Sequence, residues 1–333
     1  MKNRSQRIIN VARLRAHYLL MHRIRALEEV AARAFEDKLV HGFLYPSIGQ
    51  EALTVGVIAH LTKRDLVLST HRGHGQALAK GASSTAMFHE LLGREGGICG
   101  GKGGPPHIAD FGVGLLGSNG VISANIVIGA GAAHAVKLKK EDRIVVCYFG
   151  DGATNRGPFL EGLNWAAVFK LPLLFVCEDN GYAATTKTRT MTAGPGFLDR
   201  ASALGVPAVE VDGNDVVAVE ATAAELIRKV RAGEGPLFLH AKTFRVTGHT
   251  SSDPGAYRPK GEVEAAKAHD PIARLRELLI GAGVAVDVLD ADKASAYAEM
   301  DAAYRSAREA AFPAARMAFV DVQDVGSPLV EAF

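Results

Sequence analysis

The sequence has no strong excess of either charge, few aromatic residues and few cysteines. Its 38 Lys and Arg residues against 36 Asp and Glu give a net charge of +2, so nothing indicates nucleic acid as a bulk electrostatic partner. Its three cysteines, Cys99, Cys147 and Cys177, form no CxxC pair, which is typical of reduced, mostly buried thiols. With 48% hydrophobic and 22% charged residues, the chain is predicted to be globular rather than disordered.

Neither a secretory signal nor a membrane span is predicted. The Arg-rich start has no acidic residue before Glu28, so a mitochondrial targeting segment is the alternative to a structural helix. An apolar stripe from Leu20 to Phe35 has helical spacing and favours the helix. The uncharged stretch 111–136 could span a membrane by length, but its six glycines favour a buried loop and a small-residue helix. We expect a cytoplasmic, bacterial-type protein with no membrane span, and the mitochondrial matrix less readily.

Apolar runs alternate with helical patterns through the middle of the chain. Buried parallel strands are predicted at 65–70, 144–149, 171–176, 206–211 and 236–241. Helices are predicted at 1–40, 49–60, 76–92, from Gly157-Pro158 onward and at 215–232, and a functional, irregular loop at 93–120. The pattern predicts an α/β fold in a single domain over 1–333, with a parallel sheet flanked by helices on both faces. The helix over 1–40 and a helical segment over 270–333 would extend it at the two ends.

Polar residues follow two neighbouring strands of the predicted sheet. Asp151 lies between two glycines after one strand, and Asn180 ends the next apolar run. Because ligands bind beyond the carboxyl ends of parallel strands, both oxygens could meet a hard cation such as Mg²⁺. Taken singly, Asp151 is better explained as a helix cap and Asn180 as a turn residue. Their joint placement favours the metal site.

Two further segments carry candidate chemistry. Residues 70–75 place His71, Arg72 and His74 after a strand, a pattern that suits an anion grip and proton transfer. Residues 245–260 are rich in Gly, Pro, Ser, Arg and His, and fit a solvated surface loop equally well. A nicotinamide-dependent dehydrogenase is a weak alternative, because Asn155 stands where the dinucleotide fingerprint needs a third glycine.

Together these motifs resemble one known family. It is the alpha subunit of the thiamine-diphosphate-dependent decarboxylating component of 2-oxo acid dehydrogenase complexes, which act on pyruvate, branched-chain 2-oxo acids or acetoin. The resemblance covers about residues 15–285 and includes the signature GDG followed at a distance by Asn, here Gly150-Asp151-Gly152 and Asn180. Supporting matches are IGQEA at 48–52, HRGHGQALAKG at 71–81, GKGG at 101–104, NGVISANIVIGAGAA at 119–133 and GHTSSDPGAYRP at 248–259. The resemblance implies the thiamine-diphosphate-binding fold.

The resemblance also implies how the cofactor and its metal are held. Asp151 and Asn180 would bind Mg²⁺ through their side chains, and Tyr182 through its backbone carbonyl. The diphosphate would be held by Arg72, Arg245, His249 and the backbone N–H groups of Gly152 and Ala153.

Other residues would lie around the reactive part of the cofactor. Gly120 and Ile122 would meet the aminopyrimidine through their backbone. His74 and His249 would lie near the reacting centre and move protons, for which an ordinary imidazole pKa is suitable. His71 stands where family members often carry Tyr, and it is expected beside the cofactor.

The implied activity is decarboxylation of a 2-oxo acid, or cleavage of acetoin, with transfer of the acyl group to lipoamide. The implied partners are a beta subunit, which completes the site in an α₂β₂ heterotetramer, and a lipoyl-bearing acyltransferase. A catalytically inactive, cofactor-binding partner subunit stays an alternative, because His71 and Pro105-Pro106 depart from the family pattern. Residues 245–260 are expected to become ordered when the cofactor binds.

Overall fold

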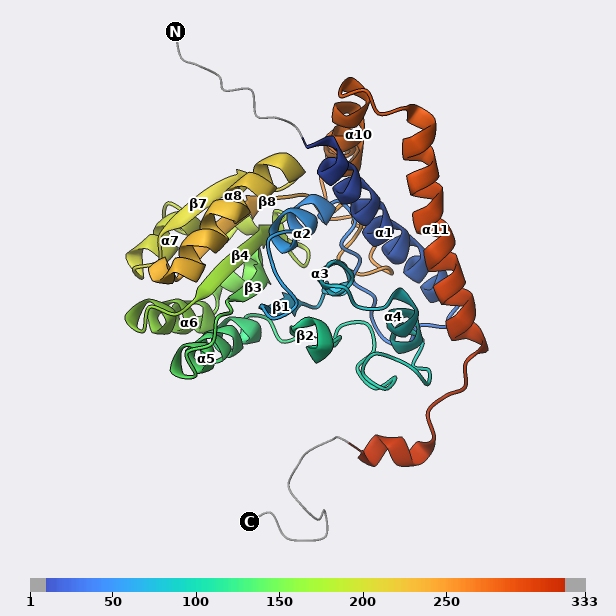
Figure 1. The fold of residues 1–333 in the computed structure, drawn as a ribbon, viewed down its shortest axis with the longest axis horizontal. Coiled ribbons are helices and arrows are strands. Elements are labelled where there is room, and N and C mark those ends of the chain that lie inside the picture. The colour runs from blue at the N-terminus through green and yellow to red at the C-terminus, as the bar shows by residue number, and fades with distance from the viewer. Residues whose placement is uncertain (1–9, 321–333) are drawn as a thin grey trace.

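Six parallel strands form the centre of the computed structural model, which describes residues 10–320 (Figure 1). Their order across the sheet is β2-β1-β3-β4-β8-β7. The strands are β1 (Leu66–Thr70), β2 (Leu115–Asn119), β3 (Val145–Gly150), β4 (Leu173–Asp179), β7 (Ala208–Asp212) and β8 (Leu237–Lys242). The predicted α/β class with a parallel sheet is confirmed.

Both faces of the sheet are buried, as the continuous apolar runs predict. Side chains alternate between the faces: Val67 and Val146 enter one hydrophobic cluster, whereas Leu68 and Cys147 enter the other. The first cluster is covered by α2 (Glu51–Ile58) and α8 (Val216–Lys229). The second is covered by α5 (Ala124–Leu138), α6 (Gly157–Val168) and α7 (Phe197–Ala203).

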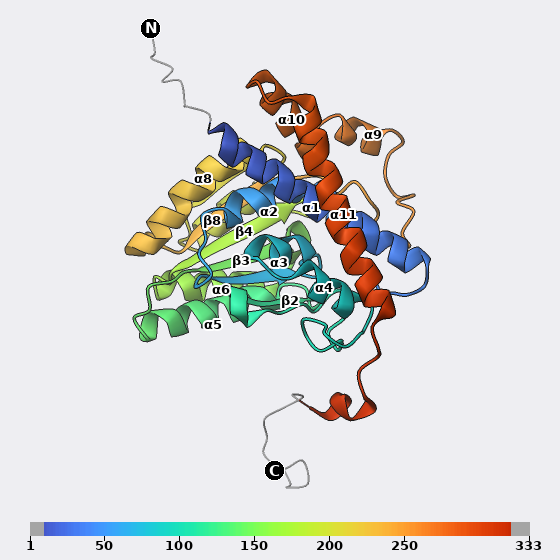
Figure 2. The ribbon, with the colours of Figure 1, turned by 45° about the vertical axis from the view of Figure 1, so that its right-hand side comes forward.

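The remaining helices form a second layer beyond α2. Figures 1 and 2 show that α1 and α11, from opposite ends of the chain, run side by side on this flank, and the two helices contact each other along their lengths. The helices of this flank are α1 (Val11–Glu36), α3 (His74–Lys80), α4 (Ser84–Leu91), α9 (Glu262–Lys267), α10 (Pro271–Gly281) and α11 (Val286–Glu309). The predicted terminal helices are therefore found, except that residues 1–9 and 321–333 lie outside the described residues.

Two expectations were wrong in detail. The helix predicted over 76–92 is interrupted, because Gly81 adopts a positive φ of 104° that ends α3 and Ser83 then caps α4. Strand β2 lies inside the predicted loop 93–120; it is short, contains Gly117 and is recognisable only through its pairing with β1. The other predicted strands are found with limits shifted by at most three residues.

Within residues 10–320, no helix combines enough length with enough apolar character to cross a membrane. The uncharged stretch 111–136 folds instead as a turn, the edge strand β2 and most of α5. On α5, Gly129 packs against Cys147 of β3, where an added Cβ would lie 3.2 Å from the Cys147 Cβ. Gly131 faces open space. The small-residue run thus supports an internal core contact on one side and leaves the other side free.

The order in which strands are added to the sheet reverses between the neighbours β1 and β3. From β1 the chain continues to β2 on one side, and from β3 it continues to β4 on the other. The carboxyl ends of β1 and β3 therefore flank a crevice, the position at which open parallel sheets bind ligands.

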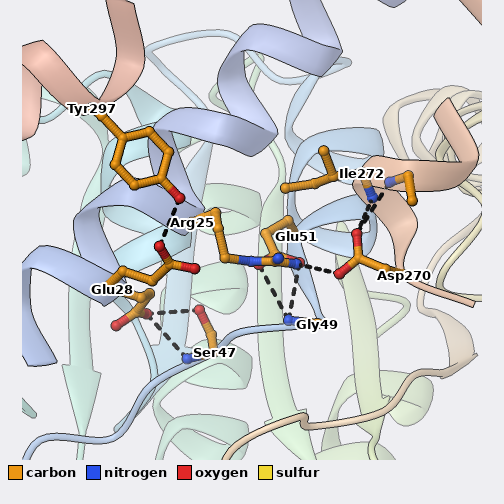
Figure 3. Close-up of polar contacts among 10 residues, drawn as sticks. Arg25, Glu28, Ser47, Gly49, Glu51, Asp270, Ile272 and Tyr297 are labelled. Atoms are coloured by element: carbon orange, nitrogen blue, oxygen red, sulfur yellow. Dashed lines mark hydrogen bonds and ion pairs between the residues drawn. The ribbon is translucent and has the colours of Figure 1, made fainter. Parts of the chain in front are cut away.

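A buried ion-pair network joins α1, the start of α2 and the N-terminus of α10 (Figure 3). Arg25 of α1 donates to Glu51 (2.5 Å) and to Asp270 (2.8 Å). Glu51 also accepts from the backbone N–H of Gly49 (3.0 Å), and Asp270 caps α10 through the N–H of Ile272 (2.9 Å). The Glu51 side chain is fully buried, so its charge depends on these donors.

This network gives a stability prediction. We expect Arg25→Met to lower the free energy of unfolding by roughly 3–5 kcal/mol, because it leaves the Glu51 carboxylate buried without its cation. The matched control is Arg23→Met on the same helix, whose partner Glu299 is part-exposed; its cost should be at most about 1 kcal/mol. Urea denaturation measures both, and equal losses for the two variants would contradict the prediction.

Candidate active site

A cavity of about 440 Å³ opens at the carboxyl edge of the sheet. Its walls come from the segments that follow β1, β2, β3, β4 and β8. All the predicted cofactor residues line it, namely His71, Arg72, Gly120, Ile122, Asp151, Gly152, Ala153, Asn180, Tyr182, Arg245 and His249. His74 does not line it.

Two arginine side chains are buried at this cavity. Arg72 is 5% exposed and Arg245 is 1% exposed. Neither forms an ion pair with a carboxylate within residues 10–320; Arg72 donates to the carbonyls of Pro46 (2.9 Å) and His249 (2.8 Å), and Arg245 to the hydroxyl of Tyr257 (2.9 Å). Burial, reinforced by the charge of Arg245, lowers the pKa of Arg72 to about 9. Two buried cations that face one cavity make it attractive to an anion.

Asp151 brings a carboxylate to the same cavity. It begins a 3-10 turn directly after β3, is 2% exposed and accepts a hydrogen bond from the hydroxyl of Thr188. Burial raises the pKa of Asp151 to about 6, which the Thr188 hydrogen bond partly opposes. Asp151 does not cap α6, whose N-cap position is taken by Arg156. The explanation of Asp151 as a cap for that helix is therefore wrong.

The other predicted metal ligands are placed beside it. The Asn180 side-chain oxygen accepts from the backbone N–H of Tyr182 (3.2 Å), so the turn role is confirmed, and both residues also line the cavity. No group of three or more His, Cys, Asp or Glu side chains in the described part of the chain is arranged to hold a metal. A cation at Asp151 would therefore need amide, carbonyl and ligand oxygens as well, a donor set that suits Mg²⁺ on a phosphate compound.

A close contact explains why the residue that follows Asp151 in the GDG segment is a glycine, Gly152. A Cβ on Gly152 would lie 2.6 Å from the Cβ of Ala183, on the small hairpin of β5 (Tyr182–Ala183) and β6 (Thr186–Lys187). A Cβ on Gly150 would meet nothing within 4 Å. Gly152 thus lets the turn after β3 approach the segment that carries Asn180.

Three rings form one wall of the cavity. Tyr45 lies 4.6 Å from His71 and 5.3 Å from His249 between ring centroids, and the two imidazoles are 5.7 Å apart. Burial, followed by the charge of Arg72, lowers the pKa of His71 to about 2 and that of His249 to about 4. Both rings are therefore neutral at pH 7. The expectation that His249 has an ordinary imidazole pKa is wrong, and the sequence analysis missed Tyr45.

His74 lies behind the cavity in a buried ion pair. Its side chain is fully buried; Nδ1 lies 3.1 Å from Glu28 and Nε2 3.0 Å from the carbonyl of Pro105. Glu28 also accepts from the hydroxyl (2.7 Å) of Ser47 (Figure 3). Burial opposes a charge on His74, but the Glu28 carboxylate outweighs it and raises the pKa of His74. The geometry therefore gives His74 a structural role, joining α1 to the Gly-rich loop, in place of the predicted position at the reacting centre.

Sequence reasoning missed other residues of the site. Thr188, which orients Asp151, lies in a polar segment that has no recognisable motif. Glu178 lines the cavity, is nearly buried and accepts from Gln76 (3.0 Å); burial raises its pKa to about 7. Its position one residue after an apolar strand run was the only signal in the sequence.

The segment 245–260 is held by its own side chains. Arg258 donates to the carbonyls of Arg245 (2.7 Å), Val246 (3.0 Å) and Thr247 (2.8 Å). Asp253 accepts from the backbone N–H of Gly255 (2.8 Å). This segment carries Arg245 and His249 to the cavity, so it is more than a solvated loop; its ordering by cofactor stays a prediction.

Residues 20–316 match the family model described as the dehydrogenase E1 component. The chain belongs to this family. The family resemblance inferred from the motifs is confirmed. The match gives no support to the alternative of a nicotinamide-dependent dehydrogenase.

Several members of the E1 family are similar to this chain over most of its length. It is 40% identical over 307 residues to the alpha subunit of acetoin:2,6-dichlorophenolindophenol oxidoreductase of Cupriavidus necator, covering 92% of each chain. The protein of the same name from Bacillus subtilis is 41% identical over 264 residues, 79% of each chain. The pyruvate dehydrogenase E1 component subunit alpha of Rhizobium meliloti is 38% identical over 271 residues, 81% of this chain and 78% of the relative.

Membership of the E1 family implies thiamine diphosphate as the cofactor. The residues present fit that group. Arg72 and Arg245 supply two buried positive charges without a carboxylate partner in the described residues, and Asp151 supplies one buried carboxylate at the same edge. A diphosphate with a divalent cation complements this charge pattern.

We expect Thr188→Val to weaken Mg²⁺-dependent binding of thiamine diphosphate by about 10–100-fold, because the hydroxyl that orients Asp151 is lost. The control is Thr190→Val, whose hydroxyl donates to the carbonyl of Lys187 (2.7 Å) and does not contact Asp151. Calorimetric titration of cofactor at fixed Mg²⁺ measures both affinities. Unchanged affinity in Thr188→Val would show that Asp151 is positioned without it.

Proposed function

We propose that this chain is the alpha subunit of a thiamine-diphosphate- and Mg²⁺-dependent dehydrogenase. The enzyme would decarboxylate pyruvate or a related 2-oxo acid, or cleave acetoin, and pass the acyl group to lipoamide. The observation that carries the proposal is the convergence of Arg72, Arg245 and Asp151 at one cavity on the carboxyl edge of the sheet. Similarity to acetoin and pyruvate enzymes over most of the chain supports it.

In this proposal the cavity residues divide the work of binding. Asp151 and Asn180 hold Mg²⁺ with the backbone carbonyl of Tyr182. Bound thiamine diphosphate supplies a carbon nucleophile and accepts the negative charge that develops on the substrate. The diphosphate is held by Arg72, Arg245, His249, Gly152 and Ala153, and the aminopyrimidine by the backbone of Gly120 and Ile122. His71 lines the cavity close to these groups.

A beta subunit is the proposed partner, and one face of the chain suits it. Helices α5 and α6 pack together and expose an apolar surface, which we name the α5–α6 face. It consists of Val127, Ile128, Leu138, Leu160, Trp165, Val168 and Phe169. Val121 and Ile122, which are exposed at the cavity, lead directly into α5. Clustered exposed apolar side chains favour an interaction site, and we propose that a subunit bound there would also close the cavity.

The remaining partners follow from the same assignment. We propose an α₂β₂ heterotetramer that hands its product to a lipoyl-bearing acyltransferase, in the cytoplasm of a bacterium. The named relatives that support this are themselves called alpha subunits. Nucleic acid and a membrane have no place in the proposed function.

The first test is turnover by the chain co-expressed with its beta subunit. With thiamine diphosphate and Mg²⁺ present, we expect reduction of an acceptor dye with one of pyruvate, 3-methyl-2-oxobutanoate or acetoin. Asp151→Ala should abolish it, because the carboxylate at the proposed metal position is lost. Asp199→Ala, an exposed position on α7, is the control and should keep full activity. A well-formed complex that binds cofactor without turning over any of the three would favour the inactive partner subunit.

The docking surface has its own test. We expect Leu160→Glu to prevent assembly with the beta subunit, because it places a charge within the proposed apolar contact. Val286→Glu, an exposed apolar position at the start of α11, is the matched control and should assemble normally. Size-exclusion chromatography with light scattering distinguishes complex from free chain. Normal assembly of Leu160→Glu would exclude the α5–α6 face as the contact.

A further inference from the structure

The hydrogen bond between Arg72 and His249 determines where the imidazole proton lies. The Nη2 of Arg72 is 2.9 Å from Nδ1 of His249, and the same group donates to the carbonyl of His249 (2.8 Å). A guanidinium can only donate hydrogen bonds. The Nδ1 atom of His249 therefore has to offer its lone pair, which puts the single ring proton on Nε2 and leaves the ring neutral.

The ring of His249 leaves its Nε2–H group available to a ligand. The ring lines the cavity, and its Nε2 has no hydrogen-bond partner among residues 10–320. Arg72 also lies over the ring of Tyr45, with its guanidinium carbon 5.7 Å from the ring centroid, and donates to the carbonyl of Pro46 (2.9 Å). The terminal nitrogens of Arg72 are thus engaged with Pro46 and His249.

We propose that Arg72 is a positioning residue, which holds His249 as the neutral tautomer protonated on Nε2. His249 then donates a hydrogen bond to an oxygen atom of the bound ligand and does not exchange protons with it. This goes beyond the role of Arg72 as a binder of the diphosphate. The tautomer belongs to the chain itself; only the identity of the acceptor oxygen rests on the proposed function.

The charges around His249 also favour the neutral imidazole ring. Burial, followed by the charges of Arg72 and Arg245, lowers the pKa of His249 to about 4, although the Asp253 carboxylate opposes them. Asp253 accepts from the backbone N–H of His249 (2.5 Å). The neighbouring His71 ring is neutral, because burial lowers its pKa to about 2. Among residues 10–320, only Asp253 favours an imidazolium at His249, and burial with the charges of Arg72 and Arg245 outweighs it.

The tautomer can be measured directly by nitrogen NMR of the full chain labelled with ¹⁵N-histidine. His249→Gln identifies the resonances of this ring among those of the 12 histidines. We expect Nδ1 to show the shift of an unprotonated ring nitrogen and Nε2 that of a protonated one, without change between about pH 5.5 and 8. An imidazolium, an Nδ1–H tautomer or a mixture in the wild-type chain would overturn the proposal.

Two arginine variants separate positioning from charge. In Arg72→Met the Nδ1 partner is lost, so we expect both tautomers to appear and the pKa of His249 to rise from about 4 towards the ordinary value of 6.5. In Arg245→Met a charge is removed without loss of that bond, so the pKa should rise but the Nε2–H tautomer should persist. Arg72→Lys, which keeps a donor, covers the case in which Arg72→Met does not fold and should retain the tautomer. The same tautomer in wild type and Arg72→Met would contradict the role of Arg72.

Additions of ligand identify the acceptor. The Nε2 resonance should move when thiamine diphosphate and Mg²⁺ are added if a phosphate oxygen accepts, or on later addition of acetoin if a substrate oxygen does. A resonance that moves at neither step would exclude the donor role. Because the tautomer is read in the chain without substrate, this experiment remains decisive even if dehydrogenase turnover is not found.

Discussion

Two arginine side chains, Arg72 and Arg245, are buried at one edge of a parallel sheet, and much of the structure keeps them there. A buried charge without a counter-charge is costly, and within the described residues no carboxylate forms an ion pair with either guanidinium. Backbone carbonyls and a phenol satisfy their donors instead. The packing of the sheet and of the helices around it offsets this cost, so the cavity retains two guanidinium charges that no direct ion pair neutralises.

One ion-pair network joins the helices around this cavity, and its member Glu51 directly follows the cavity residue Gln50. Arg25 links α1 to the first residue of α2 and to the N-cap of α10, so both ends of the chain are tied to the segment that precedes the site. Three residues further along α1, Glu28 holds His74 and Ser47. The N-terminal helix therefore reaches the binding site through two buried carboxylates, Glu51 and Glu28, although it contributes no residue to the cavity.

The two histidines to which the motifs assign the same task are in opposite electrostatic environments. His74 is paired with a carboxylate and a carbonyl, both acceptors, which favours the charged ring. His249 accepts from a guanidinium, which requires the neutral ring. Neighbouring groups can drive similar side chains to different protonation states in this way. A motif names the residue type, but the partners that decide its protonation lie far away in sequence.

The pattern of residues along the chain was enough to predict the class of fold and most of the site. Continuous apolar runs predicted buried parallel strands. The polar residues that follow these strands had to meet at one edge of the sheet, because the carboxyl ends of parallel strands point the same way. Asp151, Asn180, Arg72 and Arg245 could therefore be named in advance. The folded structure was needed to find the pairing of β2 with β1, the contact of Thr188 with Asp151 and the partners of His74 and His249. These features depend on contacts between segments that are distant in sequence. A local pattern of residues does not indicate which distant segment will pack against it.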